Sequence, residues 1–454
     1  MTNFRKSDTR IQKSYLAIIF VTLATIISAI ATFALIIDPF AIFDMPVRSG
    51  LNRLKPSVAN FIRIHKAERL SRGDIRALIF GTSTTEFGYD PHHSLFEGKT
   101  AYNIGMPNSN VFEQYRYFQH ALENNKIDMA VFAFDFFSFN TYLRATSKTR
   151  FGYIDGLLST DEDGSPRYLE PALEKILVGL LSYDAAKESF KTLRYNLSHA
   201  NYDQLAITYL ENGERDDMQA ERTRVFAGGY RKYFFNVLSD LDSVYFQSEK
   251  KRFCIYSESG HSFSSFKYLR RIIDLAKAHG VRLVLLFTPS HAAELEAIRH
   301  FGLFDLWNDW KRRVVQATEK SYAQGGPRVP VYDFQTYSKF NTEPIPPIGA
   351  TDQVMSYYWD SEHLKKALGN IVFDLIKEPP STASSVPGMF GSMLTSGMLE
   401  THFEKVEENR TAWRRGNSKQ FEAIESFLAK SYRQKLPKLL ASSCKYRRTS
   451  SIEK

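Results

Sequence analysis

The chain has 454 residues, of which 43% are hydrophobic and 24% are charged. This composition is that of a globular protein with a sizeable core, and it excludes a wholly disordered chain, a collagen-like repeat and a polytopic membrane protein. The two cysteines, Cys254 and Cys444, are too few for a disulfide scaffold, and they form neither a CxxC motif nor a Cys/His cluster. We therefore expect no structural zinc site.

The formal net charge is +9, and most of the excess lies at the end of the chain. Residues 401–454 contain thirteen basic and six acidic residues, so the rest of the chain is close to neutral. A basic tail with few stacking aromatics is typical of a solvated or membrane-surface segment rather than of a sequence reader. We expect no nucleic-acid partner, and a basic, partly helical or disordered tail over residues 398–454 that has anionic lipid or polymer as its candidate ligand.

An uncharged, mostly apolar run of 22 residues begins at Leu16 and ends at Ile37, directly before Asp38 and Pro39. As a helix it would span about 33 Å, enough for a hydrocarbon core of about 30 Å. The run is longer than the apolar region of a cleaved signal peptide. It is also longer than most buried core helices that lack a charged residue. The sequence predicts a transmembrane anchor over residues 16–37.

The charges that flank this run predict its orientation. Four basic residues precede it, whereas the first one after it is Arg48 (the four are Arg5, Lys6, Arg10 and Lys13). The positive-inside rule then places residues 1–15 in the cytoplasm and the rest of the chain outside it. We expect a single-pass protein of the inner (cytoplasmic) membrane whose main domain is periplasmic or otherwise extracytoplasmic. That location argues against chemistry that depends on ATP or a nicotinamide.

Apolar runs of strand length alternate with helical patterns over residues 60–376, which we expect to form the main domain. The patterns predict helices at residues 60–70, 111–124, 266–279, 303–321 and 365–376, and strands at residues 76–80, 100–104, 129–134, 281–287 and 329–334. Largely apolar strands that alternate with helices predict a mostly parallel sheet covered on both faces. The expected fold class is α/β, a three-layer α/β/α sandwich that follows one transmembrane helix.

Two regions interrupt or follow this alternation. Residues 141–265 lack a strand pattern but are rich in aromatic residues, and we expect an ordered, largely helical insertion that forms the wall of a site (Tyr202, Tyr209, Phe226, Tyr230, Tyr233, Phe234 and Phe235). Residues 377–397 are rich in Pro, Ser and Gly and are expected to be a linker. Helical periodicity returns at residues 398–415 and 419–433, where we expect low order.

Polar groups follow the first two strands and precede the last helix, and the carboxyl ends of parallel strands are where ligand sites form. The groups are Gly81-Thr82-Ser83, Asn103-Ile104-Gly105 and Asp360-Ser361-Glu362-His363. A serine becomes a nucleophile when a histidine takes its proton, and a carboxylate fixes the imidazole tautomer. Ser83, His363 and Asp360 are the candidates for these roles. Each group alone also fits a helix cap or a surface histidine, and their joint occurrence favours the catalytic interpretation.

The segments FGTSTTEFGYDP, YNIGMPNSN, FAFDFFSFN and WDSEHL resemble motifs of the SGNH hydrolases, also called the GDSL-like lipase/acylhydrolase superfamily. The resemblance covers roughly residues 70–376, with the insertion unmatched. With its tether the chain looks most like the exported branch, which includes the alginate O-acetylation and D-alanyl-lipoteichoic acid biosynthesis proteins. The resemblance implies an SGNH/flavodoxin-like fold, a nucleophile at Ser83, a supporting pair at Asp360 and His363, and an oxyanion donor in the Gly105 N–H beside that of Ser83.

The chain departs from the family pattern at two positions. Thr82 stands in place of the acid of Gly-Asp-Ser, and Asp135 stands where an asparagine would complete the oxyanion hole. An ionised Asp135 would repel a developing negative charge, so Asn140, five residues on, is the candidate substitute donor. Thr82, Asn103, Asp135 and His291 are expected to line the pocket, and His291 is also the reserve base.

These observations predict a membrane-tethered extracytoplasmic SGNH-type serine esterase or O-acyltransferase that works through an acyl-serine intermediate, without a metal or organic cofactor. The resemblance implies that the substrate is an acylated glycan or small acyl ester, with acetyl esters of a cell-envelope or exported polysaccharide foremost and the envelope polysaccharide machinery as partner. The alternative is a non-catalytic SGNH-like glycan-binding or assembly protein, which Asp135 favours.

His92 and His93 beside Asp90 have no further ligand at metal-binding spacing, so we expect a surface turn there. Neither a P-loop nor a dinucleotide-binding GxGxxG motif is present.

Overall fold

The computed structural model describes residues 3–143, 155–199, 209, 211–215, 228–241, 253–256, 265–378 and 386–432. These residues form an α/β fold around one mixed sheet of six strands in the order β2-β1-β3-β4-β5-β6. The first five strands run parallel, and β6 pairs antiparallel with β5. The strands are β1 (Ala77–Phe80), β2 (Ala101–Asn103), β3 (Met129–Phe134), β4 (Arg282–Phe287), β5 (Val331–Asp333) and β6 (Ser392–Met393).

The central strands β1 and β3 are apolar along their whole length. Every residue of β1 (ALIF) and β3 (MAVFAF) is buried, as is typical of parallel strands between helices. These two strands and β4 lie within a residue of their predicted bounds. The outer strands β2 and β5 are shorter than predicted, and the two-residue β6 was not predicted.

The five predicted helices of the main domain are present, and α12 (Ala292–His300) is an additional one. Helices α4, α11 and α13 contact one another in series, whereas α14 contacts the short helix α3 (Ser83–Gly88). The connections from β2 through β5 move along the sheet in one direction, so right-handed crossovers place α4, α11 and α13 together. The predicted helices are α2 (Ile62–Leu70), α4 (Val111–Asn124), α11 (Ser265–Ala278), α13 (Phe304–Ala323) and α14 (Lys366–Lys377).

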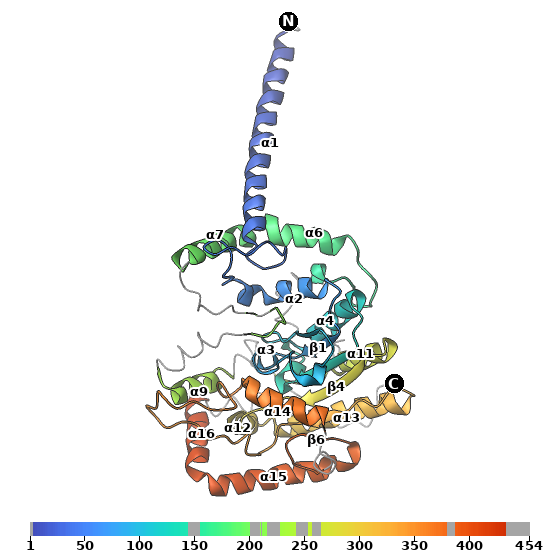
Figure 1. Ribbon diagram of the computed structural model, residues 1–454, viewed down its shortest axis with the longest axis vertical. Coiled ribbons are helices and arrows are strands. Elements are labelled where there is room, and N and C mark those ends of the chain that lie inside the picture. Colours follow the sequence, from blue (N-terminus) through green and yellow to red (C-terminus); the bar gives the residue numbers. More distant parts are fainter. Residues whose placement is uncertain are drawn as a thin grey trace.

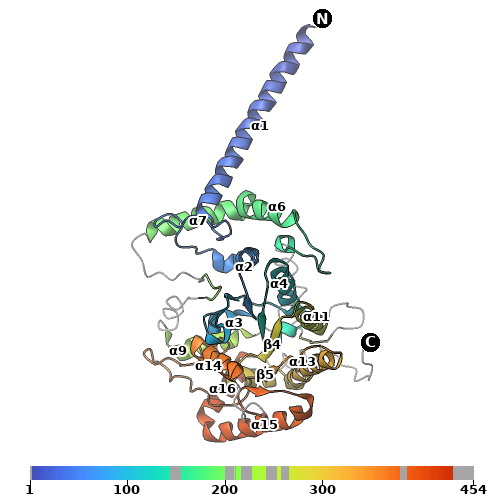
Figure 2. The same cartoon turned by 45° about the vertical axis from the view of Figure 1, so that its right-hand side comes forward.

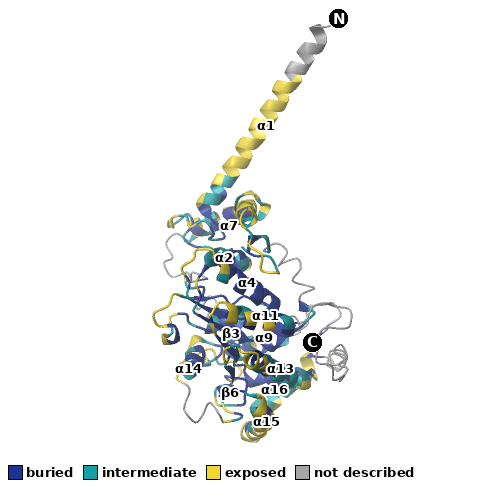
Figure 3. Ribbon diagram, turned by 90° about the vertical axis from the view of Figure 1, so that its right-hand side faces the viewer, coloured by how far each residue is buried: buried dark blue, intermediate teal, exposed yellow. Residues whose placement is uncertain are grey.

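Helix α1 (Asn3–Ile37) projects from the rest of the molecule (Figure 1). Its residues Gln12–Ile37 are long and apolar enough to cross a membrane. Figure 3 shows that most of the helix is exposed and that burial begins only near its C-terminal end. The helix ends where the sequence predicts, because Asp38 has a φ of 46° and the Lys55 ammonium donates to the carbonyl oxygen of Ile37 at 2.8 Å.

The insertion is largely helical where it is described, as expected; Tyr202 and Phe226 lie outside the described residues. Its helices are α6 (Glu170–Ile176), the π-helical turn η5 (Leu177–Leu181), α7 (Tyr183–Ser198) and α9 (Tyr230–Ser239). A short turn of the insertion lies along the sheet edge, since the Asn103 N–H of β2 donates to the carbonyl oxygen of Asn212 at 2.8 Å. This turn brings Arg215 close to α3, where its N–H donates to the carbonyl oxygen of Glu86 at 3.0 Å.

The C-terminal part differs from the expectation of a linker and a tail of low order. The predicted linker contributes β6, which is too short to show a strand pattern among Pro, Ser and Gly. Helices α15 (Leu399–Gly416) and α16 (Ser418–Ser431) agree with the predicted periodicity, and they bury Trp413 and Ile424 in the main core. Residues 433–454 lie outside the described part of the chain.

Candidate active site

Ser83 is the first residue of α3 and directly follows the sharp turn at the carboxyl end of β1. Gly81 makes this turn feasible. A Cβ atom at Gly81 would lie 1.9 Å from Oγ1 of Thr85 and 2.7 Å from the carbonyl oxygen of Ala133 in β3. A glycine is therefore required for β1 to turn into α3 beside its neighbouring strand.

Asp360 and His363 lie in a turn that precedes α14, as the sequence predicts. The turn is closed by the Trp359 N–H, which donates to the carbonyl oxygen of His363 at 2.8 Å. Oδ1 of Asp360 accepts hydrogen bonds from the N–H groups of Glu362 at 2.7 Å and of His363 at 2.8 Å. These bonds hold the carboxylate and leave its second oxygen facing the imidazole.

The structure brings Ser83, His363 and Asp360 into one hydrogen-bonded chain, although Ser83 and His363 are 280 positions apart. Nε2 of His363 lies 2.9 Å from Oγ of Ser83, and Nδ1 lies 2.8 Å from Oδ2 of Asp360. A carboxylate can only accept, so Nδ1 carries a proton, and in the neutral form of His363 Nε2 is free to accept from the serine hydroxyl. This geometry allows the imidazole to take the proton of Ser83.

The Ser83 and His363 side chains are partly exposed, whereas the carboxylate of Asp360 that orients the imidazole is buried. The His363 side chain is 19% exposed and the Asp360 side chain 2% exposed. The ring of Phe87 contacts the imidazole edge-on at 5.2 Å, and the Arg215 guanidinium lies 4.6 Å from the centre of the Phe87 ring. Ser83 is thus partly exposed, and the imidazole beside it is flanked by Phe87 and by Arg215 of the insertion.

Two opposing effects set the pKa of His363. Burial lowers the pKa, whereas the carboxylates of Asp360 and Glu362 raise it. The effect of the carboxylates is the larger, so the pKa of His363 is raised to about 9. The pKa of Glu362 is itself raised well above its ordinary value by burial, against the opposing effect of His363. The imidazole is thus largely protonated at neutral pH, and the form that can accept a proton from Ser83 grows as the pH rises.

Thr82 and Asp135 lie side by side at the ends of β1 and β3, where both were expected to line the pocket. The Thr82 hydroxyl donates to Oδ2 of Asp135, and both residues are buried. Burial raises the pKa of Asp135 to about 7, although Thr82 and His363 lower it. Asp135 is therefore largely neutral below pH 7, and its charge appears only above this value.

The expectation that the Gly105 N–H faces a substrate is wrong, because this N–H donates to Oδ1 of Asn103 at 2.8 Å. The Asn103 amide in turn donates to the carbonyl oxygens of Thr85 at 2.8 Å and Tyr89 at 2.9 Å. A Cβ atom at Gly105 would lie 2.6 Å from the Glu86 nitrogen. Asn103 and Gly105 thus hold α3 in place rather than line a pocket.

Asn140 and His291 both have structural roles. Oδ1 of Asn140 accepts from the N–H groups of Tyr142 and Cys254, both at 3.2 Å, so the buried Asn140 anchors residues 253–256, and the role of its amide N–H as an oxyanion donor stays a prediction. Nδ1 of His291 caps α12 by accepting from the Ala293 N–H at 3.1 Å, and Nε2 lies 3.0 Å from the carbonyl oxygen of Glu343. Both ring nitrogens are engaged, and burial lowers the pKa of His291 to about 4, so it is no reserve base.

The sequence analysis assigned no role to Glu362 or Arg215. Both affect the pKa of His363, which Glu362 raises and Arg215 lowers. Glu362 could have been considered from its position between Asp360 and His363, but Arg215 belongs to the insertion and carries no motif.

The His92 N–H donates to Oδ1 of Asp90 at 2.8 Å in the expected surface turn. Across the described ranges, no group of three or more His, Cys, Asp and Glu is arranged to hold a metal ion.

Comparison with known proteins gives no independent assignment of this site. No protein-family model matches the sequence, and a search of curated proteins found no significant match.

Proposed function

We propose that this protein is an SGNH-type serine esterase or O-acyltransferase, tethered to a membrane by α1. The observation that carries the proposal is the chain of hydrogen bonds from Ser83 through His363 to Asp360, with distances of 2.9 and 2.8 Å. A serine that is partly exposed and paired in this way is a nucleophile with its base and its orienting carboxylate.

The fold supports the same proposal. The strand order β2-β1-β3-β4-β5 is that of flavodoxin-like sheets, in which the direction of winding reverses between β1 and β3. Ser83 follows β1 and Asp135 follows β3, so the site lies at this switch point. We further propose a three-layer arrangement with α4, α11 and α13 on one face of the sheet and α3 and α14 on the other, which their mutual contacts support.

In the proposed reaction, Oγ of Ser83 attacks the carbonyl carbon of an acyl ester while Nε2 of His363 takes the hydroxyl proton. Asp360 stabilises the imidazolium that forms. The tetrahedral intermediate then collapses, the ester oxygen leaves with the proton from His363, and the acyl group remains on Ser83. Attack by water on the acyl-serine intermediate gives hydrolysis, and attack by a sugar hydroxyl gives transfer. No cofactor takes part in these steps.

The oxyanion requires donors other than the Gly105 N–H, which is engaged by Asn103. The N–H of Ser83 is at the N-terminus of α3, where helix geometry provides no intrahelical acceptor. We propose neutral Asp135 as the second donor, in the position of the family's asparagine. A carboxylic acid that burial keeps protonated can donate a hydrogen bond to a developing oxyanion.

The resemblance to exported SGNH proteins suggests an acyl, foremost acetyl, ester of a cell-envelope or exported polysaccharide as substrate, and the envelope polysaccharide machinery as partner. The four basic residues before the span favour a cytoplasmic N-terminus, with the main domain outside the cytoplasm.

The proposal is tested with the purified full-length chain in detergent, an aryl acetate and a fluorophosphonate probe. Wild type should hydrolyse the ester and be labelled by the probe, whereas Ser83→Ala should do neither. Ser94→Ala, which changes an exposed serine outside the site, is the matched control and should behave as wild type. Equal rates for wild type and Ser83→Ala would refute the enzymatic proposal.

One observation favours a second candidate function, a non-catalytic glycan-binding or assembly protein on the same scaffold. The Gly105 N–H is engaged by Asn103, and an acid replaces the family's asparagine donor, which leaves a weaker oxyanion hole. This candidate predicts that an acetylated glycan binds wild type and Ser83→Ala with equal affinity in calorimetry and is released unchanged. Release of acetate by wild type alone would exclude it.

A further inference from the structure

Helices α6 and α7 lie across the base of α1, joined by η5 (Figures 1 and 2). Both η5 and α7 contact α1, and α6 contacts η5. Gly179 of η5 sits directly on the loop that follows α1, since a Cβ atom there would lie 2.7 Å from Cδ1 of Ile42 and from the Phe43 ring. We refer to residues 168–198 as the platform.

The platform carries large apolar side chains that are 53–80% exposed (Leu169, Leu173, Leu177, Tyr183, Phe190 and Leu197). The three leucines up to residue 177 are spaced four apart, and the three side chains on α7 are spaced seven apart. Each spacing places its members on one side of a helix. Both helices of the platform thus carry an exposed apolar side, of the kind that marks an interaction surface.

The opposite side of the platform is bound to the α/β domain through polar contacts. On α7, Glu188 accepts from the Ser57 hydroxyl at 2.5 Å, and the Asn196 amide donates to the carbonyl oxygen of Leu54 at 2.8 Å. On α6, Lys175 pairs with Glu68 of α2 at 2.6 Å. At 3.6 residues per turn, Leu173 lies about 200° around the helix from Lys175 and so faces away from the domain.

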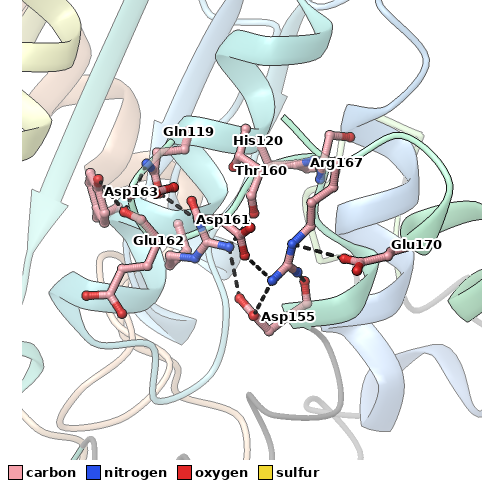
Figure 4. A network of polar contacts seen from close by, with 12 residues as sticks. Gln119, His120, Asp155, Thr160, Asp161, Glu162, Asp163, Arg167 and Glu170 are labelled. Atoms are coloured by element: carbon pink, nitrogen blue, oxygen red, sulfur yellow. Dashed lines mark hydrogen bonds and ion pairs between the residues drawn. The ribbon is translucent and has the colours of Figure 1, made fainter. Parts of the chain in front are cut away.

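Polar contacts also fix the segment that leads into α6 on the surface of α4 (Figure 4). The Arg167 guanidinium pairs with Asp155 at 3.4 Å and also with Asp161. Arg116 of α4 pairs with Asp155 at 2.9 Å and is fully buried. These pairs hold the start of the platform against the domain, so that its apolar side keeps one direction.

That direction is the one in which α1 leaves the molecule. The ring of Phe190 on α7 packs against the ring of Phe33 on α1, with their centres 4.8 Å apart. Phe33 belongs to the apolar stretch that is long enough to cross a membrane. The exposed side of α7 is therefore continuous with the membrane-facing surface of α1.

We infer that the platform lies in the surface of the bilayer that α1 crosses, with its apolar side chains among the lipids. The inference rests on α1 spanning that bilayer and adds a second point of attachment, which holds the site at a constant height and orientation. The helices from Glu170 to Ser198 contain four acidic and four basic residues. Apolar contact rather than attraction to anionic headgroups therefore holds the platform.

The test uses the full-length chain in phosphatidylcholine vesicles whose acyl chains are brominated, because bromine quenches tryptophan emission on contact. Tyr183→Trp and Leu173→Trp each add one reporter to the four native tryptophans, all of which lie outside the platform. Tyr322→Trp is the matched control, since Tyr322 is an exposed aromatic on α13, away from the platform. We expect loss of the added emission at positions 173 and 183, no loss at position 322, and the same result with added anionic lipid.

Equal emission with brominated and plain lipid at positions 173 and 183 would overturn the inference. So would a dimer in the vesicles that cross-links through the platform and protects both reporters, because a second copy would then cover the apolar side. Flotation of wild type with the vesicles checks separately that α1 is inserted, and failure to float would also overturn the inference. None of these measurements depends on esterase activity.

Discussion

At the scale of single residues, the protonation of His363 decides whether Ser83 can be activated. Burial and the two neighbouring carboxylates give the imidazole a pKa of about 9, above the ordinary value of 6.5. The proposed mechanism needs the neutral imidazole, so kcat/KM of Asp135→Asn, which carries no ionisable group at this position, should rise with pH from 6.5 towards 9. In wild type the ionisation of Asp135, with a pKa of about 7, opposes this rise. A pH–rate profile with the aryl acetate measures this limb, and a limb centred at pH 6.5 or below would contradict the prediction.

Asp360→Asn provides the control for this profile. It removes the carboxylate that raises the pKa of His363 most, so the ascending limb should move to lower pH, while the maximal rate falls by about 10⁴-fold.

The contribution of His363 to the free energy of unfolding decreases as the pH rises. A group whose pKa is raised on folding stabilises fully below its unfolded value near 6.5, and this contribution is lost as the pH rises through about 9. The protein should therefore lose this contribution to its stability over the range in which the neutral imidazole forms.

Asp135 gives a second prediction at this scale. Burial brings its pKa to about 7, so above this pH an ionised carboxylate should oppose the negative charge that develops on the substrate's carbonyl oxygen in the proposed tetrahedral intermediate. Asp135→Asn stays neutral, can donate at every pH, and should raise kcat about 10-fold or more at pH 8 to 9. The matched control is Asp128→Asn, which changes a partly exposed acid just before β3 and should leave kcat unchanged. Equal or lower kcat in Asp135→Asn would mean that the carboxyl group is not near the oxyanion.

At the scale of elements, the turn between β1 and α3 positions Ser83, the proposed nucleophile. Gly81→Ala would place a methyl group 1.9 Å from Oγ1 of Thr85 and 2.7 Å from the Ala133 carbonyl oxygen, so α3 must move. We predict a loss of about 1–3 kcal/mol in the free energy of unfolding, with fluorophosphonate labelling of Ser83 slowed more than this loss explains.

Gly416→Ala is the control for this substitution, because a Cβ atom at Gly416 would meet no atom within 4 Å. It should leave both denaturation and labelling unchanged. If Gly81→Ala labels at the wild-type rate, the turn does not position Ser83 and the geometric argument fails.

The elements also show how far the sequence could predict the structure. β1, β3 and β4 were predictable because their apolar residues are buried, from end to end in β1 and β3 and after the exposed Arg282 in β4. Ser83, Asp360 and His363 were predictable because each sits beside a strand or helix end. The two-residue β6 has no pattern to detect. The structural role of Asn140 depends on Cys254, 114 positions away, and that of His291 on Glu343, 52 positions away, so neither role could be deduced from local sequence.

At the scale of the whole molecule, the C-terminal helices belong to the α/β domain. His402 of α15 meets Asp333 of β5 at 2.8 Å, and Lys311 of α13 meets the same carboxylate at 2.6 Å. All three side chains are fully buried. Burial lowers the pKa of Lys311 to about 8, although Asp333 opposes this shift. One buried carboxylate thus joins a helix, the sheet and the C-terminal part of the chain.

Lys311→Met should therefore destabilise the whole domain, because it leaves the Asp333 carboxylate buried with one partner fewer. We predict a loss of about 3–5 kcal/mol in urea denaturation. Lys405→Met is the matched control, since Lys405 pairs with Glu408 on the exposed surface of α15 at 2.7 Å, and it should cost about 1 kcal/mol or less. Combining Lys311→Met with Asp333→Asn removes the stranded charge and should restore part of the loss. If Lys311→Met costs no more than Lys405→Met, the buried pair does not join the C-terminal helices to the sheet.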